Sequence, residues 1–219
     1  MLVLSGLDGT GKSTQAEILA RHLADQGVET STIWNRWSPA VTAPLIAMAR
    51  KRIDPRPGAA TEEYTDFTRS KRERMRSPVK RALWQTMVWS EYIVQVHARL
   101  LEAGYPRRAL ISDRYVYDTL VDMAVNFSLE QGELETLCSH ALLSLFPVPA
   151  SFVVIDIDPE TGSARKNDGT PPEYLADRRP FYLEIARLTG AAVVDGNGTI
   201  EETATGIWDG CSQWRENLA

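Results

Sequence analysis

The sequence predicts an α/β fold of three layers, in which helices cover both faces of a five-stranded parallel sheet. The chain begins with a short apolar run (residues 1–5), a glycine-rich loop, a helical pattern and a second run rich in β-branched residues (28–34). Three further strand-like runs follow between helical patterns, at 107–115, 152–158 and 191–196. Such alternation favours a parallel sheet, whose ligands gather at the carboxyl ends of the strands.

Helical patterns separate these strand-like runs. They lie at 13–26, 44–51, 62–76, 79–103, 116–127, 130–145 and 199–217. The pattern at 79–103 carries apolar side chains around most of its circumference, which predicts a buried helix. A carboxylate on a buried helix needs a partner, so Glu91 is expected to form a salt bridge with an arginine or to contact a substrate.

The length of 219 residues predicts a single domain, 1–219. The chain starts directly on an expected strand, which leaves no room for a signal peptide. No apolar run reaches the roughly 18 to 20 residues of a membrane span. Its two cysteines are far apart in the sequence, which fits a reducing compartment. We therefore expect a soluble, cytoplasmic protein without a membrane span.

The segment 6–14 fits the pattern G-x-x-x-x-G-K-[ST] and lies between an expected strand and an expected helix, as this motif requires. Its glycines let backbone N–H groups surround a phosphate at the helix N-terminus. Lys12 is expected to contact the β- and γ-phosphates of ATP, and the Ser13 hydroxyl to ligate Mg²⁺. The predicted ATP-binding residues are Gly6, Gly9, Thr10, Gly11, Lys12, Ser13 and Thr14.

A second motif is the apolar strand that ends in Asp113-Arg114-Tyr115. An apolar strand ending in Asp is typical of a Walker B carboxylate, which would lie beside the phosphate loop and hold Mg²⁺ directly or through water. Arg114 follows at the same strand end, where a second cation can bind the acceptor or the transferred phosphoryl group. Together the two motifs predict a P-loop NTPase-type fold and a phosphotransferase that uses ATP and Mg²⁺.

Three other segments are candidates for the acceptor side and a lid. Arg36 leaves the carboxyl end of the second strand and faces either the acceptor or solvent. Residues 160–180 are polar, rich in Gly and Pro and carry arginines, which suits a short lid over ATP or an ordinary surface loop. The segment 50–81 holds eleven Lys or Arg against five Asp or Glu. It forms either a groove for an anionic substrate, a lid or a solvated helix face; nucleic-acid binding is not expected, because the chain has a net charge of −5.

On these motifs the sequence resembles the thymidylate kinase family of P-loop nucleoside monophosphate kinases. Segment 6–15 is similar to the family's phosphate loop, 113–115 to its Asp-Arg-[Tyr/His] motif, and 158–160 and 179–186 to the segments that flank its lid. The resemblance extends over nearly the whole chain. It implies the reaction dTMP + ATP to dTDP + ADP with Mg²⁺, and it implies a homodimer.

The resemblance also implies roles for individual residues. Asp8 contacts the acceptor sugar, Asp113 serves the metal and the acceptor, and Arg114 binds phosphate. Because the phosphate loop contains no arginine, lid arginines are implied to stabilise the moving phosphoryl group, with Arg165 and Arg179 as candidates. The predicted catalytic residues are Lys12, Asp8, Asp113, Arg114, Arg165 and Arg179. The predicted acceptor-binding residues are Asp8, Arg36, Glu91, Arg114 and Tyr115.

The sequence departs from the family in three places on the acceptor side. Residues 35–38 replace the family's Thr-Arg-Glu-Pro and keep only its Arg; residues 88–92 lack the arginine that grips the nucleotide phosphate; and residues 118–123 replace the Ser-x-x-Ala-Tyr-Gln that holds the thymine ring. The acceptor implied by the resemblance is dTMP. Because of these departures, the alternative is a nucleoside, another nucleotide, a sugar or a lipid-linked intermediate. A GTPase switch is disfavoured because Asn-Lys-x-Asp is absent, and an inactive module because Lys12, Ser13 and Asp113 are all present.

Overall fold

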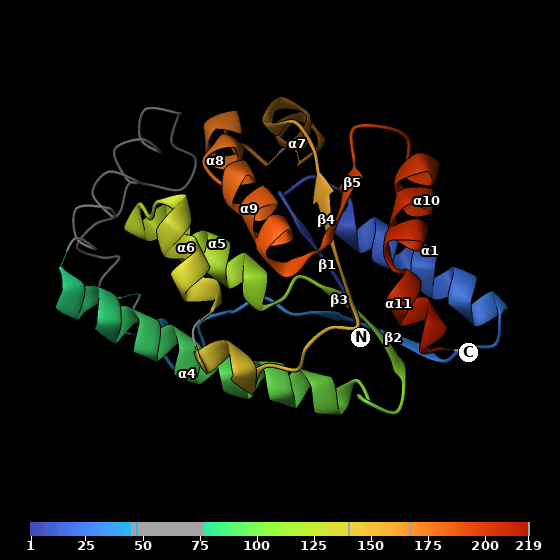
Figure 1. Cartoon of the computed structure of the whole chain (residues 1–219), viewed down its shortest axis with the longest axis horizontal. Helices are drawn as coiled ribbons and strands as arrows, with labels where there is room; N and C mark the ends of the chain where they lie inside the picture. Colours follow the sequence, from blue (N-terminus) through green and yellow to red (C-terminus); the bar gives the residue numbers. More distant parts are fainter. Residues whose placement is uncertain (45–46, 48–76, 140, 167, 219) are drawn as a thin grey trace.

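The computed structural model describes residues 1–44, 47, 77–139, 141–166 and 168–218 (Figure 1). Its centre is a sheet of five parallel strands in the order β2-β3-β1-β4-β5. The strands are β1 (Leu2–Gly6), β2 (Thr30–Trp34), β3 (Ala109–Asp113), β4 (Ser151–Asp156) and β5 (Ala192–Asp195). This sheet and its two helical layers confirm the predicted three-layer α/β fold.

Helices cover both faces of the sheet (Figure 1). One layer consists of α1 (Lys12–Asp25), α10 (Ile200–Gly210) and α11 (Ser212–Glu216). The other layer consists of α4 (Pro78–Glu102), α5 (Val116–Phe127) and α9 (Arg179–Thr189). The remaining described helices are α6 (Gln131–Cys138), a 3-10 turn (Ala141–Leu145), α7 (Pro159–Lys166) and α8 (Pro172–Ala176). None of the helices in the described ranges is long and apolar enough to cross a membrane.

Successive residues of the central strand β1 enter different cores, because neighbouring Cβ atoms on a strand point to opposite faces. Leu2 and Leu4 pack with α1 and α10, whereas Val3 packs with α4, α5 and α9. All five residues of β1 are buried. Burial on both faces is what a parallel sheet covered by helices requires. This packing holds in place the carboxyl end of β1, where the phosphate loop starts.

Helix α4 differs from the prediction of a helix buried on all sides. Its buried residues are Val88, Trp89, Tyr92, Val96 and Leu100. The opposite face is open among the described residues, with Val79 77%, Leu83 70%, Val94 69% and Leu101 75% exposed. The prediction was wrong because apolar residues all round a helix do not determine how many of its faces are covered. In the described part of the chain, the other elements pack against one face of α4.

Two predicted helices are shorter than expected. The pattern at 199–217 is divided into α10 and α11 at Cys211, and the pattern at 130–145 becomes α6 followed by a 3-10 turn. The segment expected as a lid, 160–180, contains α7 and α8, and Leu175 in α8 is fully buried. The expected helix 62–76 and most of the basic segment 50–81 lie outside the described residues.

Candidate active site

The phosphate loop connects β1 to α1 and contains glycines in backbone conformations that other residues rarely adopt. Gly6, Gly9 and Gly11 all have positive φ angles, of 137°, 87° and 81°. A Cβ atom on Gly6 would lie 2.2 Å from the carbonyl oxygen of Ile155, and one on Gly9 would lie 2.3 Å from that of Gly162. The loop is therefore packed tightly against β4 and α7, and its backbone is shaped for close contact with an anion.

Lys12 is buried at the start of α1, with 5% of its surface exposed. Its Nζ donates to the carbonyl oxygens of Gly6 (3.1 Å) and Leu7 (2.6 Å) and to the Thr10 hydroxyl (2.9 Å). Burial, followed by the nearby Arg114 cation, lowers the pKa of Lys12 to about 7. A neighbouring phosphate would favour the charged form, so this ammonium group is suited to an anionic ligand.

Ser13 and Asp113 meet at the carboxyl end of β3. The Ser13 hydroxyl donates to Asp113 Oδ2 at 2.5 Å. The other carboxylate oxygen, Oδ1, is buried and has no hydrogen-bond partner among the described residues. A buried carboxylate oxygen without a partner is costly, and carboxylate and hydroxyl oxygens are ligands that Mg²⁺ prefers. The two residues therefore fit the magnesium site that the sequence predicts.

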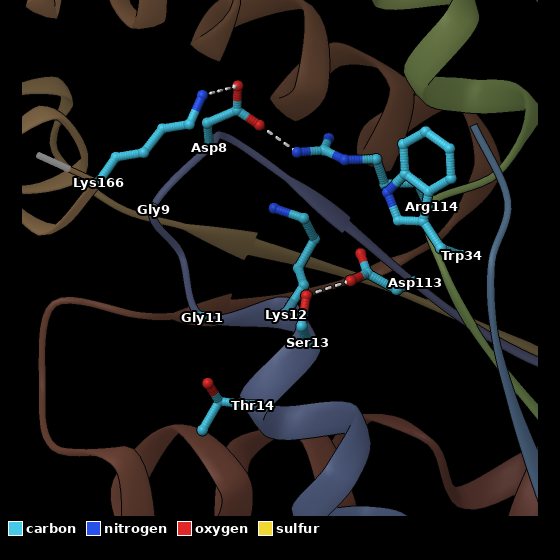
Figure 2. A pocket seen from close by; sticks show the side chains of 10 residues that line it. All are labelled: Asp8, Gly9, Gly11, Lys12, Ser13, Thr14, Trp34, Asp113, Arg114 and Lys166. Carbon is cyan, nitrogen blue, oxygen red and sulfur yellow. Dashed lines mark hydrogen bonds and ion pairs between the residues drawn. The ribbon is translucent and has the colours of Figure 1, made fainter. Parts of the chain in front are cut away.

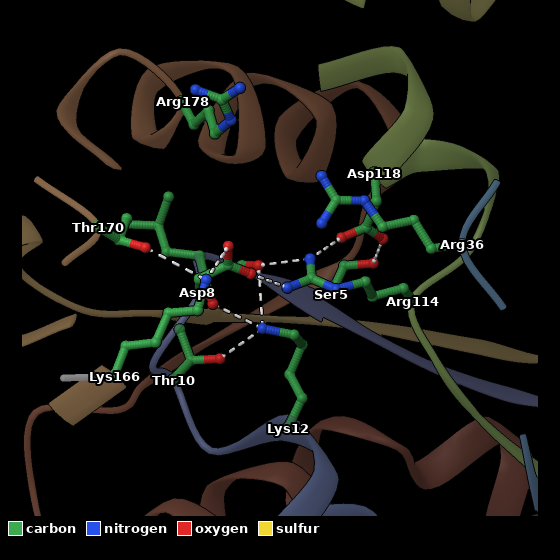
Figure 3. Close-up of polar contacts among 12 residues, drawn as sticks. Ser5, Asp8, Thr10, Lys12, Arg36, Arg114, Asp118, Lys166, Thr170 and Arg178 are labelled. Carbon is green, nitrogen blue, oxygen red and sulfur yellow. Dashed lines mark hydrogen bonds and ion pairs between the residues drawn. The ribbon is translucent and has the colours of Figure 1, made fainter. Parts of the chain in front are cut away.

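Arg114 is held between two carboxylates. One guanidinium nitrogen pairs with Asp8, and the other donates to Asp118 Oδ1 at 2.7 Å (Figure 3). Arg114 also has a φ of 72°, which is uncommon for a residue with a side chain. Such a conformation costs on the order of 1–3 kcal/mol and persists only where surrounding contacts impose it.

Asp118, at the start of α5, accepts hydrogen bonds from four residues of this cluster, of which Arg114 is one. Its side chain is fully buried and also accepts hydrogen bonds from the Ser5 hydroxyl (2.6 Å), the Tyr182 hydroxyl (2.7 Å) and the Tyr115 backbone N–H (3.0 Å). Burial alone would raise its pKa, but the Arg114 cation and these donors lower the pKa of Asp118. In the sequence this residue is visible only as part of a departure from a family motif.

Asp8 lies at the tip of the phosphate loop between two cations. Besides Arg114, the Lys166 ammonium contacts it, with Nζ 3.2 Å from Asp8 Oδ2. Burial would raise the pKa of Asp8, but Arg114, Lys12 and Lys166 lower it to about 2. Asp8 is therefore a carboxylate at neutral pH.

These groups border one open pocket, which Figure 2 shows. Lys12, Ser13 and Asp113 lie on one side of it, and Asp8 and Lys166 on the other. Its volume is about 250 Å³, several times the ~30 Å³ that a water molecule occupies in the liquid. The full lining is Asp8, Gly9, Gly11, Lys12, Ser13, Thr14, Trp34, Asp113, Arg114 and Lys166. The structure thus brings most of the residues of the two motifs to one pocket and adds Trp34 and Lys166, whereas Gly6, Thr10 and Tyr115 do not line it.

The two arginines predicted for the lid do not line this pocket. Arg165 donates to backbone carbonyl oxygens of the turn after β5, at 2.7 Å to Gly196 and 3.3 Å to Asn197. Arg179 binds Asp156 through two nitrogens, each at 2.8 Å, and Asp158 at 3.0 Å. Lys166, which no sequence motif singled out, reaches the pocket from the C-terminus of α7.

Arg36 lies near the site but is paired with a carboxylate. Its guanidinium group is 2.6 Å from Asp122 Oδ2, and Arg178 Nε is 3.5 Å from the other oxygen of Asp122. Figure 3 shows Arg36 and Arg178 on the same side of the Arg114–Asp118 pair. Asp122 belongs to the 118–123 segment in which the sequence departs from the family motif.

The other two predicted acceptor residues make structural contacts. Glu91 accepts backbone N–H groups of Ala40 (2.7 Å) and Val41 (2.6 Å) and the hydroxyl of Thr42 (2.6 Å). It therefore anchors the loop after β2 to α4, a role that differs from both expected ones. Tyr115 is 1% exposed, and its hydroxyl donates to the carbonyl oxygen of Pro147 at 2.9 Å.

Several curated proteins that this chain resembles are named thymidylate kinase. The chain is 26% identical to a thymidylate kinase of Ruegeria pomeroyi, over 94% of this chain and 91% of that protein. It is 27% identical to the thymidylate kinases of Cereibacter sphaeroides, over 92% of this chain and 88% of that protein, and of Symbiobacterium thermophilum, over 92% and 87%. No protein-family model matches the chain. These relatives support the resemblance seen in the motifs, at low identity but over most of the chain.

Proposed function

We propose that this protein is a nucleotide kinase that transfers the γ-phosphoryl group of ATP to dTMP. The observation that supports this most directly is the arrangement of Lys12, Ser13 and Asp113 around one pocket, with an unpaired carboxylate oxygen beside the Ser13 hydroxyl. Relatives named thymidylate kinase over most of the chain support the nucleotide class of substrate.

In this reaction an oxygen of the acceptor phosphate forms a bond to the γ-phosphorus of ATP. The bond from phosphorus to the bridging oxygen breaks, and its electron pair stays on ADP. Lys12 and the backbone N–H groups of the loop would bind the β- and γ-phosphates, while Arg114 and Asp8 would orient the acceptor. Ser13 and Asp113 would hold Mg²⁺, which would neutralise negative charge on the phosphates of ATP.

The test is ADP release from ATP and Mg²⁺ by the purified protein, with dTMP, dUMP, thymidine and the other nucleoside monophosphates offered separately. We expect dTMP to stimulate release more than any other acceptor. Lys12→Ala, with an unchanged circular dichroism spectrum, is the control for activity from contaminating kinases. ADP release that no phosphate acceptor stimulates would contradict the proposal.

A second candidate is a kinase with another acceptor, favoured by the Arg36–Asp122 pair. An arginine that already binds a carboxylate at 2.6 Å has less charge to offer a phosphate dianion. Thymidine tests whether the acceptor is a nucleoside, because its attacking group would be a hydroxyl and it carries no phosphate. Stimulation by thymidine and not by dTMP would favour the second candidate.

A further inference from the structure

The cations of the expected lid have different partners. Arg165 and Arg179 use their donors on backbone carbonyl oxygens and on Asp156 and Asp158. The Arg178 guanidinium lies 3.4 Å from the centre of the Tyr174 ring and donates to the Tyr174 carbonyl oxygen. In the described part of the lid, Lys166 is the cation that borders the phosphate pocket.

The lid holds the Lys166 ammonium group in place from its own side. Asp168 Oδ2 lies 2.9 Å from Lys166 Nζ, and the Thr170 hydroxyl lies 3.3 Å from it. Asp168 is itself fixed by the Thr170 N–H and hydroxyl, at 3.0 and 2.6 Å. Partial burial disfavours the charge, but Asp168 and Asp8 raise the pKa of Lys166, so the side chain stays charged.

Lys166 also contacts Asp8 of the phosphate loop, and this pair lies on one side of the pocket, opposite Lys12 (Figure 2). Asp8 has a second cationic partner, Arg114, whose guanidinium group is itself held by Asp118. Lys166 can therefore leave Asp8 without leaving a buried carboxylate unpaired, which would be costly. A γ-phosphate between Lys12 and Lys166 would offer the ammonium group a more highly charged partner.

We propose that Lys166 is the lid residue that contacts the transferred phosphoryl group, in place of Arg165 or Arg179, and that Asp8 holds it over the pocket before nucleotide binds. This inference rests on the proposed phosphoryl transfer. Lys166 keeps its proton throughout, because its role is to stabilise negative charge on the γ-phosphoryl oxygens as the bond to ADP breaks. A lysine can bind a phosphoryl oxygen as a compact point charge.

The test compares Lys166→Ala, Lys166→Arg and wild type, with Arg187→Ala as the matched control. Arg187 is an exposed cation of α9 whose charge is paired with Glu184. We expect Lys166→Ala to lower kcat about 100-fold, the usual effect of removing one donor to a transition-state oxyanion. Lys166→Arg should recover part of this loss, and Arg187→Ala should leave kcat unchanged.

A second measurement separates phosphoryl contact from simple closure of the lid. We expect Lys166→Ala to bind ADP within about threefold of wild type but to bind ADP with aluminium fluoride, a mimic of the transferred phosphoryl group, about 100-fold more weakly. Equal weakening of both ligands would mean that Lys166 only closes the lid, and would overturn the inference. A wild-type protein without acceptor-dependent turnover would instead refute the proposed function, so the two failures are distinguishable.

Discussion

The two sides of the site differ in how their charged groups are partnered. On the donor side, the hydrogen bonds of Lys12 go to neutral oxygens, and one oxygen of Asp113 has no partner among the described residues. On the acceptor side, Arg36 and Arg114 are already paired with carboxylates. In the proposed reaction the donor side has groups available for phosphates and a metal ion, whereas on the acceptor side Arg36 would exchange its ion pair with Asp122 for a contact with the substrate.

The largest effect on activity is expected from a substitution on the donor side. Lys12→Ala removes the cation that we propose binds the β- and γ-phosphates, and we expect kcat to fall about 10³-fold or more. The fold should remain, because the side chain lies in the phosphate pocket and its hydrogen bonds go to the loop itself. Steady-state ADP release measures the loss of kcat, and the thermal unfolding midpoint measures whether the fold is retained. Turnover near the wild-type rate would show that this loop is not the donor site.

Asp113→Asn tests whether the unpaired oxygen serves a metal ion. An amide keeps the shape and a hydrogen bond with Ser13 but removes the negative charge. We expect the Mg²⁺ concentration for half-maximal velocity to rise about 10- to 100-fold, the range seen when groups that support a bound metal are changed. A Mg²⁺ titration at saturating ATP measures this. An unchanged titration curve would contradict a metal role for Asp113.

The ion pairs around Asp8 predict a dependence of stability on pH. The pKa of Asp8 is about 2 in the folded protein, against an ordinary value of 3.8, and its side chain is 17% exposed. Because the folded-state pKa is lower, the stabilisation of about 2 kcal/mol is present above pH ~4 and is lost as the pH falls towards 2. Urea unfolding of wild type and Asp8→Asn should show a stability difference that shrinks over this range. A constant difference would mean that Asp8 is not strongly paired.

The smallest effect is expected from a substitution on the acceptor side. Asp122→Asn frees Arg36 from a pair in which each side chain is about one quarter exposed, at 25% and 27%. Such partly solvated pairs contribute about 0–1 kcal/mol, so KM for a phosphate acceptor should fall by at most about fivefold. Michaelis constants for dTMP and thymidine, measured on both proteins, test this. A lower KM for thymidine alone would indicate that Arg36 does not meet a phosphate.

The donor side could be predicted because its residues are nearly contiguous. Gly6 to Thr14 run continuously from the end of β1 through the phosphate loop into α1, and Asp113 is recognisable as the end of an apolar strand. Its place beside Ser13 follows from the pairing of β1 with β3. Local sequence therefore decided most of the fold class and this half of the site.

The acceptor side depends on contacts between distant segments. Arg36 and Asp122 are 86 positions apart, and Asp8 and Lys166 are 158 apart. Arg165 and Lys166 are neighbours on α7, so the orientation of this helix about its own axis determines which of the two side chains faces the pocket. One signal was present in the sequence: Asp118 and Asp122 both lie in the segment that departs from the family motif, and both pair with arginines of the site.

The most direct test of phosphoryl transfer at this site is product identification in a mixture. The protein would be incubated with ATP, Mg²⁺ and equal amounts of dTMP, dUMP, thymidine and the other nucleoside monophosphates, and the products quantified by mass spectrometry. We predict dTDP as the main product, formed in a one-to-one ratio with ADP and absent with Lys12→Ala. ADP without any phosphorylated acceptor, or the same products from Lys12→Ala, would contradict a kinase that works through Lys12, Ser13 and Asp113.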